Sequence, residues 1–246
     1  MKIILVTSQI TYIKDNYLNL LGPFFKSNYK QIAGLIILKN FSIDLMLKAL
    51  ALRFTGAPNM SKTLIKNMTQ LHLKKREKLC AEYGIPVRSF LSMNESRAIN
   101  WVKELDVDLI VNMRTRCIYK KEILQAPRLG CINIHHGILP ESRGTFCDLH
   151  ALSSGNPAGF SIHYMTEKID AGQILHVEIV SDGSKKDYMN YLANSGPIEA
   201  RALSKVINDI EKSGLLGFPN KTDHPVFTKN PTRNEIKKML SEGMIL

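Results

Sequence analysis

The chain has 246 residues, of which 44% are hydrophobic and 22% are charged. This composition excludes a disordered, collagen-like or disulfide-stapled chain and is typical of a globular protein with a sizeable core. The formal net charge of +11 favours anionic partners such as nucleotides and phosphates. The longest basic cluster, "LKKREK" at residues 73–78, has no aromatic residues for stacking on bases, so we expect no nucleic-acid partner.

Short apolar runs rich in isoleucine and valine predict buried strands along the first half of the chain. They lie at residues 2–8, 33–38, 85–91, 108–113 and 130–135. Helical patterns separate them, at residues 15–26, 42–54, 59–82, 94–105 and 120–125. Strands and helices that alternate in this way predict an α/β fold with a doubly wound, mostly parallel sheet, a variant of the Rossmann fold.

The pattern changes after residue 157. Two strand-like runs, at residues 158–165 and 172–180, follow each other with no helix between them, which predicts a late antiparallel addition to the sheet. A long helix is expected over residues 185–213, interrupted at Pro197. We therefore expect one main domain over residues 1–213, and a C-terminal extension over residues 214–246 that contains a loop and a capped helix.

The sequence also bears on the location of the protein. No apolar run approaches the roughly 20 residues of a membrane span, and the opening "MKIILVTSQI" is too short in apolar residues for a secretion signal. We expect a cytoplasmic protein with no membrane span. The segment "FSIDLMLKALALRF", at residues 41–54, allows two interpretations, an amphipathic helix on a membrane surface or a helix packed on the core. We expect core packing.

Candidate site residues gather in "GCINIHHGILPESRG", at residues 130–144. Asn133 and His135 are two apart in a strand, so they project from the same face, at the carboxyl end where open α/β sheets bind ligands. Asp170 lies in a short loop 35 positions after His135. A carboxylate beside an imidazole orients the ring and favours its protonated form, which suits acid/base chemistry. The alternative is that these are hydrogen-bonded structural residues.

A metal site is a second interpretation of the same region. Cys131 and Cys147, with His150 and either His135 or His136, form a set of possible zinc ligands. Their spacing lacks the two close ligand pairs of familiar zinc sites, so we expect no metal and ordinary buried thiols.

The order of these residues resembles the 10-formyltetrahydrofolate-dependent formyltransferases. The family signature is Asn-x-His, a Leu-Pro turn, Arg-Gly and an Asp-x-Gly loop, and the resemblance covers about residues 108–180. The chain departs from the family at His136 and Gly137, and it has "NMRTRC" where relatives carry Gly-Tyr. The matching residues are Asn133, His135, Leu139, Pro140, Arg143, Gly144, Asp170 and Gly172.

This resemblance implies a mechanism without a metal or a covalent intermediate. Asn133 and His135 would stabilise the negative charge that develops on the formyl oxygen when an amine attacks, and Asp170 would orient His135. 10-Formyltetrahydrofolate is the implied cosubstrate, and its pterin would lie against two loops and two side walls. The implied folate-binding residues are Arg116, Cys117, Ile118, Tyr119, Ile138, Leu139, Glu167, Lys168 and Ile169.

The resemblance leaves the acceptor amine open. The tRNA enzyme of the family carries an additional β-barrel domain, and this chain stops before it, whereas sugar-nucleotide N-formyltransferases often have a modest C-terminal extension. We therefore expect an amino-sugar nucleotide, with a dTDP carrier, as substrate for cell-surface polysaccharide synthesis. Arg143 and Gly144 are the expected substrate-binding residues, and a homodimer is possible. The alternatives are phosphoribosylglycinamide formyltransferase and a non-catalytic folate- or nucleotide-sensing protein.

Overall fold

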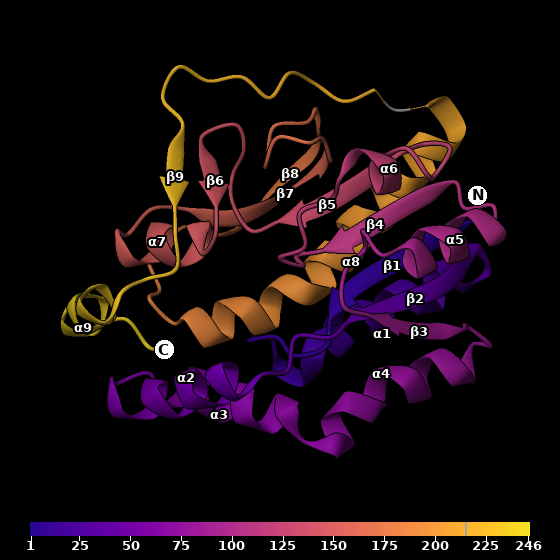
Figure 1. Ribbon diagram of the computed structural model, residues 1–246. Coiled ribbons are helices and arrows are strands. Elements are labelled where there is room, and N and C mark those ends of the chain that lie inside the picture. The colour runs from indigo at the N-terminus through magenta and orange to yellow at the C-terminus, as the bar shows by residue number, and fades with distance from the viewer. Residues whose placement is uncertain (215) are drawn as a thin grey trace.

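The computed structural model describes residues 1–214 and 216–246, with the side chains of residues 70–73 left out. In this described part, seven strands form one sheet in the order β3-β2-β1-β4-β5-β7-β8 (Figure 1). The strands are β1 (Ile3–Ser8), β2 (Ile32–Leu38), β3 (Val87–Phe90), β4 (Leu109–Met113), β5 (Cys131–His135), β7 (Ala158–Tyr164) and β8 (Ile174–Ser181).

The sheet is parallel from β3 to β5, and β7 and β8 add to it in antiparallel fashion. Strand β1 lies between β2 and β4, so the strand order reverses there, as in other open α/β sheets that bind ligands at their carboxyl edge. The predicted fold class and the late antiparallel addition are confirmed.

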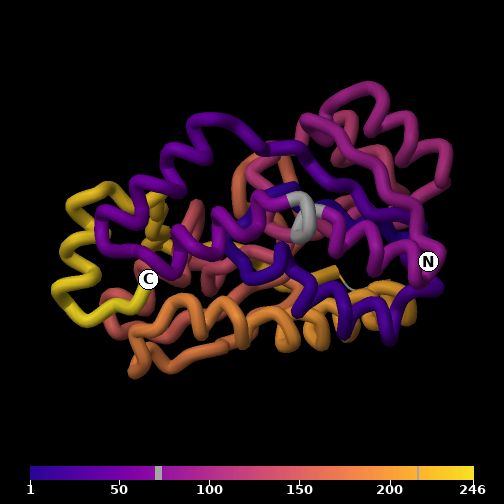
Figure 2. The backbone as a smooth tube through the Cα atoms, turned by 90° about the horizontal axis from the view of Figure 1, so that it is seen from below, coloured from indigo at the N-terminus to yellow at the C-terminus, as the bar shows by residue number. Residues whose placement is uncertain are grey.

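Helices cover both faces of this sheet. Because alternate residues of a strand point to opposite faces, Ile3 and Leu5 belong to a core shared with α1 and α8, while Ile4 and Val6 pack with α5. Figure 2 shows α1 and α8 side by side. The helices are α1 (Leu18–Asn28), α2 (Ile43–Phe54), α3 (Pro58–Met68), α4 (Gln70–Glu82), α5 (Ser96–Glu104), α6 (Lys121–Leu124), α7 (Cys147–Ser153), α8 (Tyr188–Ser213) and α9 (Arg233–Ser241).

Helix α8 is continuous through Pro197, so the predicted interruption was wrong. A proline has no amide hydrogen, which leaves the carbonyl group four residues earlier without its helical donor. That carbonyl belongs to Ala193, and it accepts instead from Nδ2 of Asn19, on α1, at 3.0 Å. A side chain from the neighbouring helix therefore replaces the missing bond.

The single helix predicted over residues 59–82 is two helices, α3 and α4, which meet at Thr69. The backbone of Thr69 is extended, with ψ at 146°. Its amide and its hydroxyl group both donate to the carbonyl of Lys66, at 3.1 and 2.9 Å, which ends α3. The buried side chain of Asn67 donates to the carbonyl groups of Thr11 and Ile13 at 2.9 and 2.6 Å, and so fixes this end of α3 against the loop after β1.

The expected core packing of residues 41–54 holds for one face of α2 only, where Ala49 and Leu45 belong to a small core cluster and Leu52 packs against the main core. Within α2, which the structure describes in full, Ala49 is the one buried residue. The helix lies at the periphery of the molecule, beside α3 (Figure 1). Ile43, Leu47 and Phe54 are 70%, 57% and 83% exposed. Among the described residues, no helix has both the length and the apolar composition that crossing a bilayer requires.

The segment after Gly214 contains more than the predicted loop and helix. A short strand, β9 (Val226–Thr228), pairs in parallel with β6 (Ser142–Gly144), which follows the candidate histidine. Helix α9 begins with the predicted cap, because Thr232 and Glu235 form a reciprocal capping box. Its apolar side chains Ile236 and Met239 join the core of the same chain.

Candidate active site

Asn133 lies in the middle of β5, a strand described in full, and it is the one residue there that is not buried. The strand register sets it between Asn112 of β4 and His163 of β7. Nδ2 of Asn112 donates to Oδ1 of Asn133 at 2.8 Å, and Nδ2 of Asn133 lies 3.3 Å from Nε2 of His163. Nδ1 of His163 donates to the carbonyl of Tyr164 at 2.8 Å, so Nε2 accepts from Asn133 whenever the ring is neutral. Within the described residues, the second amide hydrogen of Asn133 has no partner.

His135 ends β5 on the same face as Asn133, as the two-residue period predicts. Its Nε2 lies 2.9 Å from the carbonyl oxygen of Ser142, which accepts a hydrogen bond only if this nitrogen carries the proton. Nδ1 then faces Oδ1 of Asp170, at 3.6 Å. Gly137 permits this arrangement, because a side chain there would meet the imidazole and the carbonyl of Ser142.

Asp170 occupies the loop between β7 and β8, as predicted, with a left-handed φ of 49°. The loop brings its carboxylate beside two imidazoles, since Oδ1 lies 3.6 Å from both Nδ1 of His135 and Nε2 of His163. Oδ2 accepts from the amide of Gly144 at 2.9 Å. The structure thus brings together the three predicted catalytic residues, Asn133, His135 and Asp170, and adds His163 to them.

Burial and neighbouring charges act in opposite directions on the pKa values of His135 and Asp170. Burial lowers the pKa of His135, and the nearby carboxylate of Asp170 raises it without reversing the shift. Burial by itself raises the pKa of Asp170, yet the contacts with His163, His135 and the amide of Gly144 together bring it below its usual value. Asp170 thus acts in the expected direction, toward the protonated ring, but desolvation of the ring is the larger effect and leaves the pKa of His135 below its usual value.

A second polar network lies directly behind the site, around His136. Nδ1 of this ring lies 2.7 Å from Oδ2 of Asp148, on α7, and Nε2 lies 2.8 Å from Oε1 of Glu199, on α8. The guanidinium of Arg114 contacts Nδ1 of His136 and donates to both carboxylate oxygens of Glu199, at 2.9 and 3.1 Å. Burial alone raises the pKa of Glu199, but Arg114 and His136 bring it to about 2. This network joins the ends of β4 and β5 to two helices.

Arg143 and Gly144, the predicted substrate-binding residues, form part of β6. A backbone φ of 99° favours glycine at 144, and a side chain there would collide with Thr228 of β9. Arg143 donates to the carbonyl of Pro140 and to both oxygens of Asn220, at 3.1 to 3.2 Å. Among the described residues, its Nη1 has no partner.

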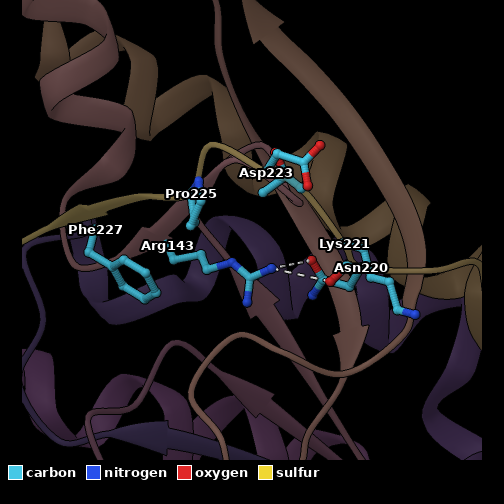
Figure 3. Close-up of a pocket in the computed structure, with 7 residues that line it drawn as sticks. Arg143, Asn220, Lys221, Asp223, Pro225 and Phe227 are labelled. Atoms are coloured by element: carbon cyan, nitrogen blue, oxygen red, sulfur yellow. Dashed lines mark hydrogen bonds between the residues drawn. The ribbon is translucent and has the colours of Figure 1, made fainter.

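Arg143 also borders an open pocket of about 600 Å³ between β6 and the segment after α8. Figure 3 shows its side chain between Phe227 on one side and Asn220 on the other. The aromatic ring of Phe227 is 63% exposed. The pocket is lined by Arg143, Asn220, Lys221, Thr222, Asp223, Pro225 and Phe227.

The residues expected to hold the folate divide into exposed and buried groups. Ile118 and Ile169 are 61% and 56% exposed, although both are apolar. The side chains of Tyr119 and Leu139 are buried instead, so only their backbone remains for a ligand. Nη2 of Arg116 donates to Asn230 of the tail, at 3.1 Å. The partly exposed residues are Cys117 and Ile138, and the exposed ones are Arg116, Glu167 and Lys168.

Among the side chains that the structure describes, no group of three or more His, Cys, Asp or Glu residues has the arrangement of a metal site. Cys147 lies 3.7 Å from Nε2 of His135 and accepts from the hydroxyl of Thr228 at 3.1 Å. Burial raises the pKa of this thiol to about 12. The free cysteine beside the site is therefore a neutral packing group, which is also how buried thiols usually behave.

Some site residues were missed in the sequence. Glu199 lies among the apolar positions Leu192, Leu203 and Val206 of one helix face, and a carboxylate in such a stripe signals a buried ion pair. His163 follows Ser161 in a predicted strand, but its place beside Asn133 depends on the register of two strands. No local pattern marks Asn220, whose side chain binds a loop 50 positions earlier.

A polar cluster lies at the carboxyl edge of a mostly parallel sheet, with a side-chain amide donor beside a His–Asp pair, an arrangement suited to acyl-group chemistry. The family model described as formyl transferase matches residues 65–207. The chain belongs to the formyl transferase family.

Several known proteins are similar to the chain. The methionyl-tRNA formyltransferase of Bacillus cytotoxicus is 35% identical over 160 residues, which is 63% of this chain and 50% of that protein. A second such enzyme, from Bacillus cereus, is 34% identical over the same share. The chain thus spans about half the length of the curated relatives it matches.

Solved structures share the fold at lower identity. A sugar N-formyltransferase from a Shewanella species aligns with a TM-score of 0.62 and 16% identity, over 98% of this chain and 88% of that one. A 4-N formyltransferase from Francisella tularensis aligns with a TM-score of 0.58 and 19% identity, over 98% of this chain and 87% of that one. A phosphoribosylglycinamide formyltransferase from Anaplasma phagocytophilum aligns with a TM-score of 0.60 and 16% identity, over 93% of this chain and 99% of that one.

Proposed function

We propose that the chain is an N-formyltransferase that moves the formyl group of 10-formyltetrahydrofolate to the amine of an amino-sugar nucleotide, a dTDP-linked amino deoxysugar for cell-surface polysaccharide. The observation that carries the proposal is the meeting of Asn133, His135 and Asp170 at the carboxyl edge of the sheet in a formyl transferase family member. When bound, the folate supplies an electrophilic formyl carbon, and the chain's own residues handle charge and protons.

Asn133 is the candidate oxyanion donor. Its amide oxygen is held by Asn112, and one amide hydrogen is turned to His163, so the orientation of the group is fixed before any ligand arrives. The remaining hydrogen is directed by this fixed geometry and is available to the formyl oxygen. A donor that needs no reorganisation stabilises developing negative charge more effectively than a mobile one.

His135 is the candidate base. Its lowered pKa favours the neutral ring at neutral pH, so the ring can accept the proton that the attacking amine loses, directly or through water. With Nε2 donating to Ser142, the proton arrives at Nδ1, the nitrogen that faces Asp170 at 3.6 Å. Asp170 then stabilises the resulting cation, and the cation adds positive charge beside the oxyanion. The cation would return its proton to N10 of the folate as the bond between N10 and the formyl carbon breaks.

The proposed folate site is supported by exposed apolar side chains. Ile118 follows β4 and Ile169 precedes the candidate carboxylate, and both leave more than half of their surface open to water. Flat pterin rings bind to such apolar walls while backbone groups satisfy their polar edge. We propose the folate-binding residues Arg116, Cys117, Ile118, Tyr119, Ile138, Leu139, Glu167, Lys168 and Ile169, the buried ones acting through their backbone.

The pocket beside Arg143 supports an anionic nucleotide as acceptor. Arg143 and Lys221 supply positive charge, and the exposed ring of Phe227 supplies a surface for stacking. Because the tail contributes most of the lining, we propose a catalytic domain at residues 1–213 and a substrate-binding extension at 214–246. A solved sugar N-formyltransferase and a solved 4-N formyltransferase each align over 98% of the chain.

The test is a formyl-transfer assay with 10-formyltetrahydrofolate and several acceptors, read by mass spectrometry. The panel contains dTDP-linked amino sugars, glycinamide ribonucleotide and methionyl-tRNA, since the curated relatives are named for the last of these. We expect a mass increase of one formyl group on an amino-sugar nucleotide. Transfer to glycinamide ribonucleotide or methionyl-tRNA alone would contradict the proposed acceptor, and folate binding without any transfer would contradict the enzyme.

A further inference from the structure

An apolar stripe covers the outer face of α2, far from the residues assigned to the reaction. Successive members at Ile43, Leu47, Leu50 and Phe54 are three or four residues apart, which places them on one face of the helix. They are exposed where such a helix face is normally buried against the core. We name this face the α2 stripe, and it consists of Phe41, Ile43, Met46, Leu47, Leu50 and Phe54.

The rest of α2 explains why the stripe faces outward. Ala49 on the opposite face is fully buried and packs with Ile10 and Leu64, and Leu45 packs against the same small cluster. The inner face of α2 thus packs against α3, and its second apolar face, the α2 stripe, stays exposed. Patches of this kind mark interaction surfaces on soluble proteins, because water contact with large apolar side chains is unfavourable.

Charge around the stripe indicates the chemistry of the partner. Residues 39–68 contain one acidic side chain, Asp44, which pairs with Lys48 at 2.6 Å. On the helix, Arg53 borders the stripe beside Met46 on one flank, and Asp44 with its paired Lys48 lies on the other, as the 100° rotation per residue requires. The basic residues of this segment, all exposed, are Lys39, Lys48, Arg53, Lys62 and Lys66.

We propose that the α2 stripe docks the protein on an anionic lipid bilayer surface. An apolar face with phenylalanine and leucine, bordered by lysine and arginine, is the composition of helices that lie in the plane of a membrane interface. A second copy of the chain fits less well, because a two-fold contact between stripes would bring the basic flanks of both copies together. The family model begins at residue 65, so the stripe lies outside the matched region.

The inference goes beyond formyl transfer, and its test does not depend on activity. Sedimentation with vesicles of phosphatidylcholine alone, and of phosphatidylcholine with phosphatidylglycerol, measures binding of the whole protein. We expect binding to the anionic vesicles that weakens in 0.5 M salt, since charge attraction is screened. Arg53→Gln should weaken binding to the anionic vesicles about fivefold, because one basic residue near an anionic membrane surface contributes about that factor to affinity.

A matched pair of variants tests the stripe itself. Ile43→Ser with Leu47→Ser removes two side chains that are 70% and 57% exposed, and we expect vesicle binding to fall at least about tenfold. The control, Leu91→Ser with Ile179→Ser, removes side chains that are 72% and 60% exposed elsewhere, and it should bind like the wild type. Circular dichroism should show both variants folded.

Three outcomes would overturn the proposal. The first is equal binding to neutral and anionic vesicles, and the second is unchanged binding by the stripe variant. The third is a wild-type dimer in light scattering that the Ile43→Ser and Leu47→Ser variant dissociates, with no vesicle binding, since the stripe would then be a contact between two copies.

Discussion

The side-chain amide of Asn220 donates to the main-chain carbonyl of Asp170 at 3.0 Å and to that of Gly172 at 2.8 Å. A buried residue of the C-terminal extension thereby holds the loop that carries the candidate carboxylate. Asn220 also accepts from Arg143 through its side-chain oxygen, at 3.1 Å. One amide therefore couples the predicted catalytic loop to the predicted substrate-binding strand.

Asn220→Ala should lower turnover by about tenfold or more, because the Asp170 loop loses two hydrogen bonds that fix its backbone. Steady-state kinetics on the folded variant measure this effect. Asn234→Ala is the matched control, since Asn234 is exposed on α9 in the same extension. Normal turnover of Asn220→Ala would show that the loop holds its own shape.

His135→Ala and Asp170→Asn should each lower turnover by at least about 100-fold, the usual scale for a lost base or oxyanion contribution. The proteins should stay folded. Formyl transfer in single-turnover conditions isolates the chemical step, with His176→Ala as a histidine control on β8. A folded His135→Ala protein with near-normal turnover would remove His135 from the mechanism.

Lys221→Gln should raise KM for a nucleotide acceptor several-fold and leave KM for the folate unchanged, because Lys221 lines the pocket beside Arg143 and lies outside the proposed folate loops. Initial rates at varied acceptor and varied folate separate the two constants. Lys237→Gln, on the exposed face of α9, serves as control. Equal changes in both KM values would argue against separate subsites.

Glu199→Gln should destabilise the fold by about 3–5 kcal/mol at neutral pH, since Arg114 and His136 lose a buried carboxylate partner. The pKa of Glu199 falls from 4.5 to about 2 on folding, so its contribution is complete above pH 4.5 and is lost as the pH falls toward 2. Denaturant unfolding at several pH values should therefore show a shallower acid loss in the variant. Glu211→Gln, exposed on the same helix, should retain the wild-type profile.

Asn19→Ala should cost about 1–3 kcal/mol in the free energy of unfolding, because the carbonyl of Ala193 loses its donor. The cost should shrink when Pro197→Ala is also present, since alanine at 197 restores the helical amide donor. A double-mutant cycle by denaturant unfolding measures this coupling. Additive effects of the two substitutions would show that Asn19 does not substitute for the missing bond.

The succession of strands and helices along the chain and the candidate trio could be predicted from the sequence, because both depend on local patterns. Alternation in β5 places Asn133 and His135 on one face, and the Asp-x-Gly loop between two late strands brings Asp170 back to them. The capped helix α9 could also be predicted from the sequence, because Thr232 and Glu235 have the local spacing of a capping box.

Features that depend on partners distant in the sequence were not predictable in this way. Pro197 predicts a break in the helix when the sequence alone is considered. In the structure, Asn19 of another helix supplies the missing hydrogen-bond donor. The apolar residues of α2 were predicted to be core residues, because helical periodicity identifies an apolar face but does not show which element, if any, covers that face. The lowered pKa of His135 likewise depends on how completely the tertiary fold removes water, which no spacing of residues encodes.

The pairing of β6 with β9 has a consequence for the order in which the protein is made. Ser142 meets Val226 and Gly144 meets Thr228, so the strand next to the candidate histidine gains its neighbour only after more than eighty further residues have been synthesised. On the ribosome, all seven strands of the central sheet would be synthesised before β9, and β6 would stay unpaired until residue 228 had left the exit tunnel.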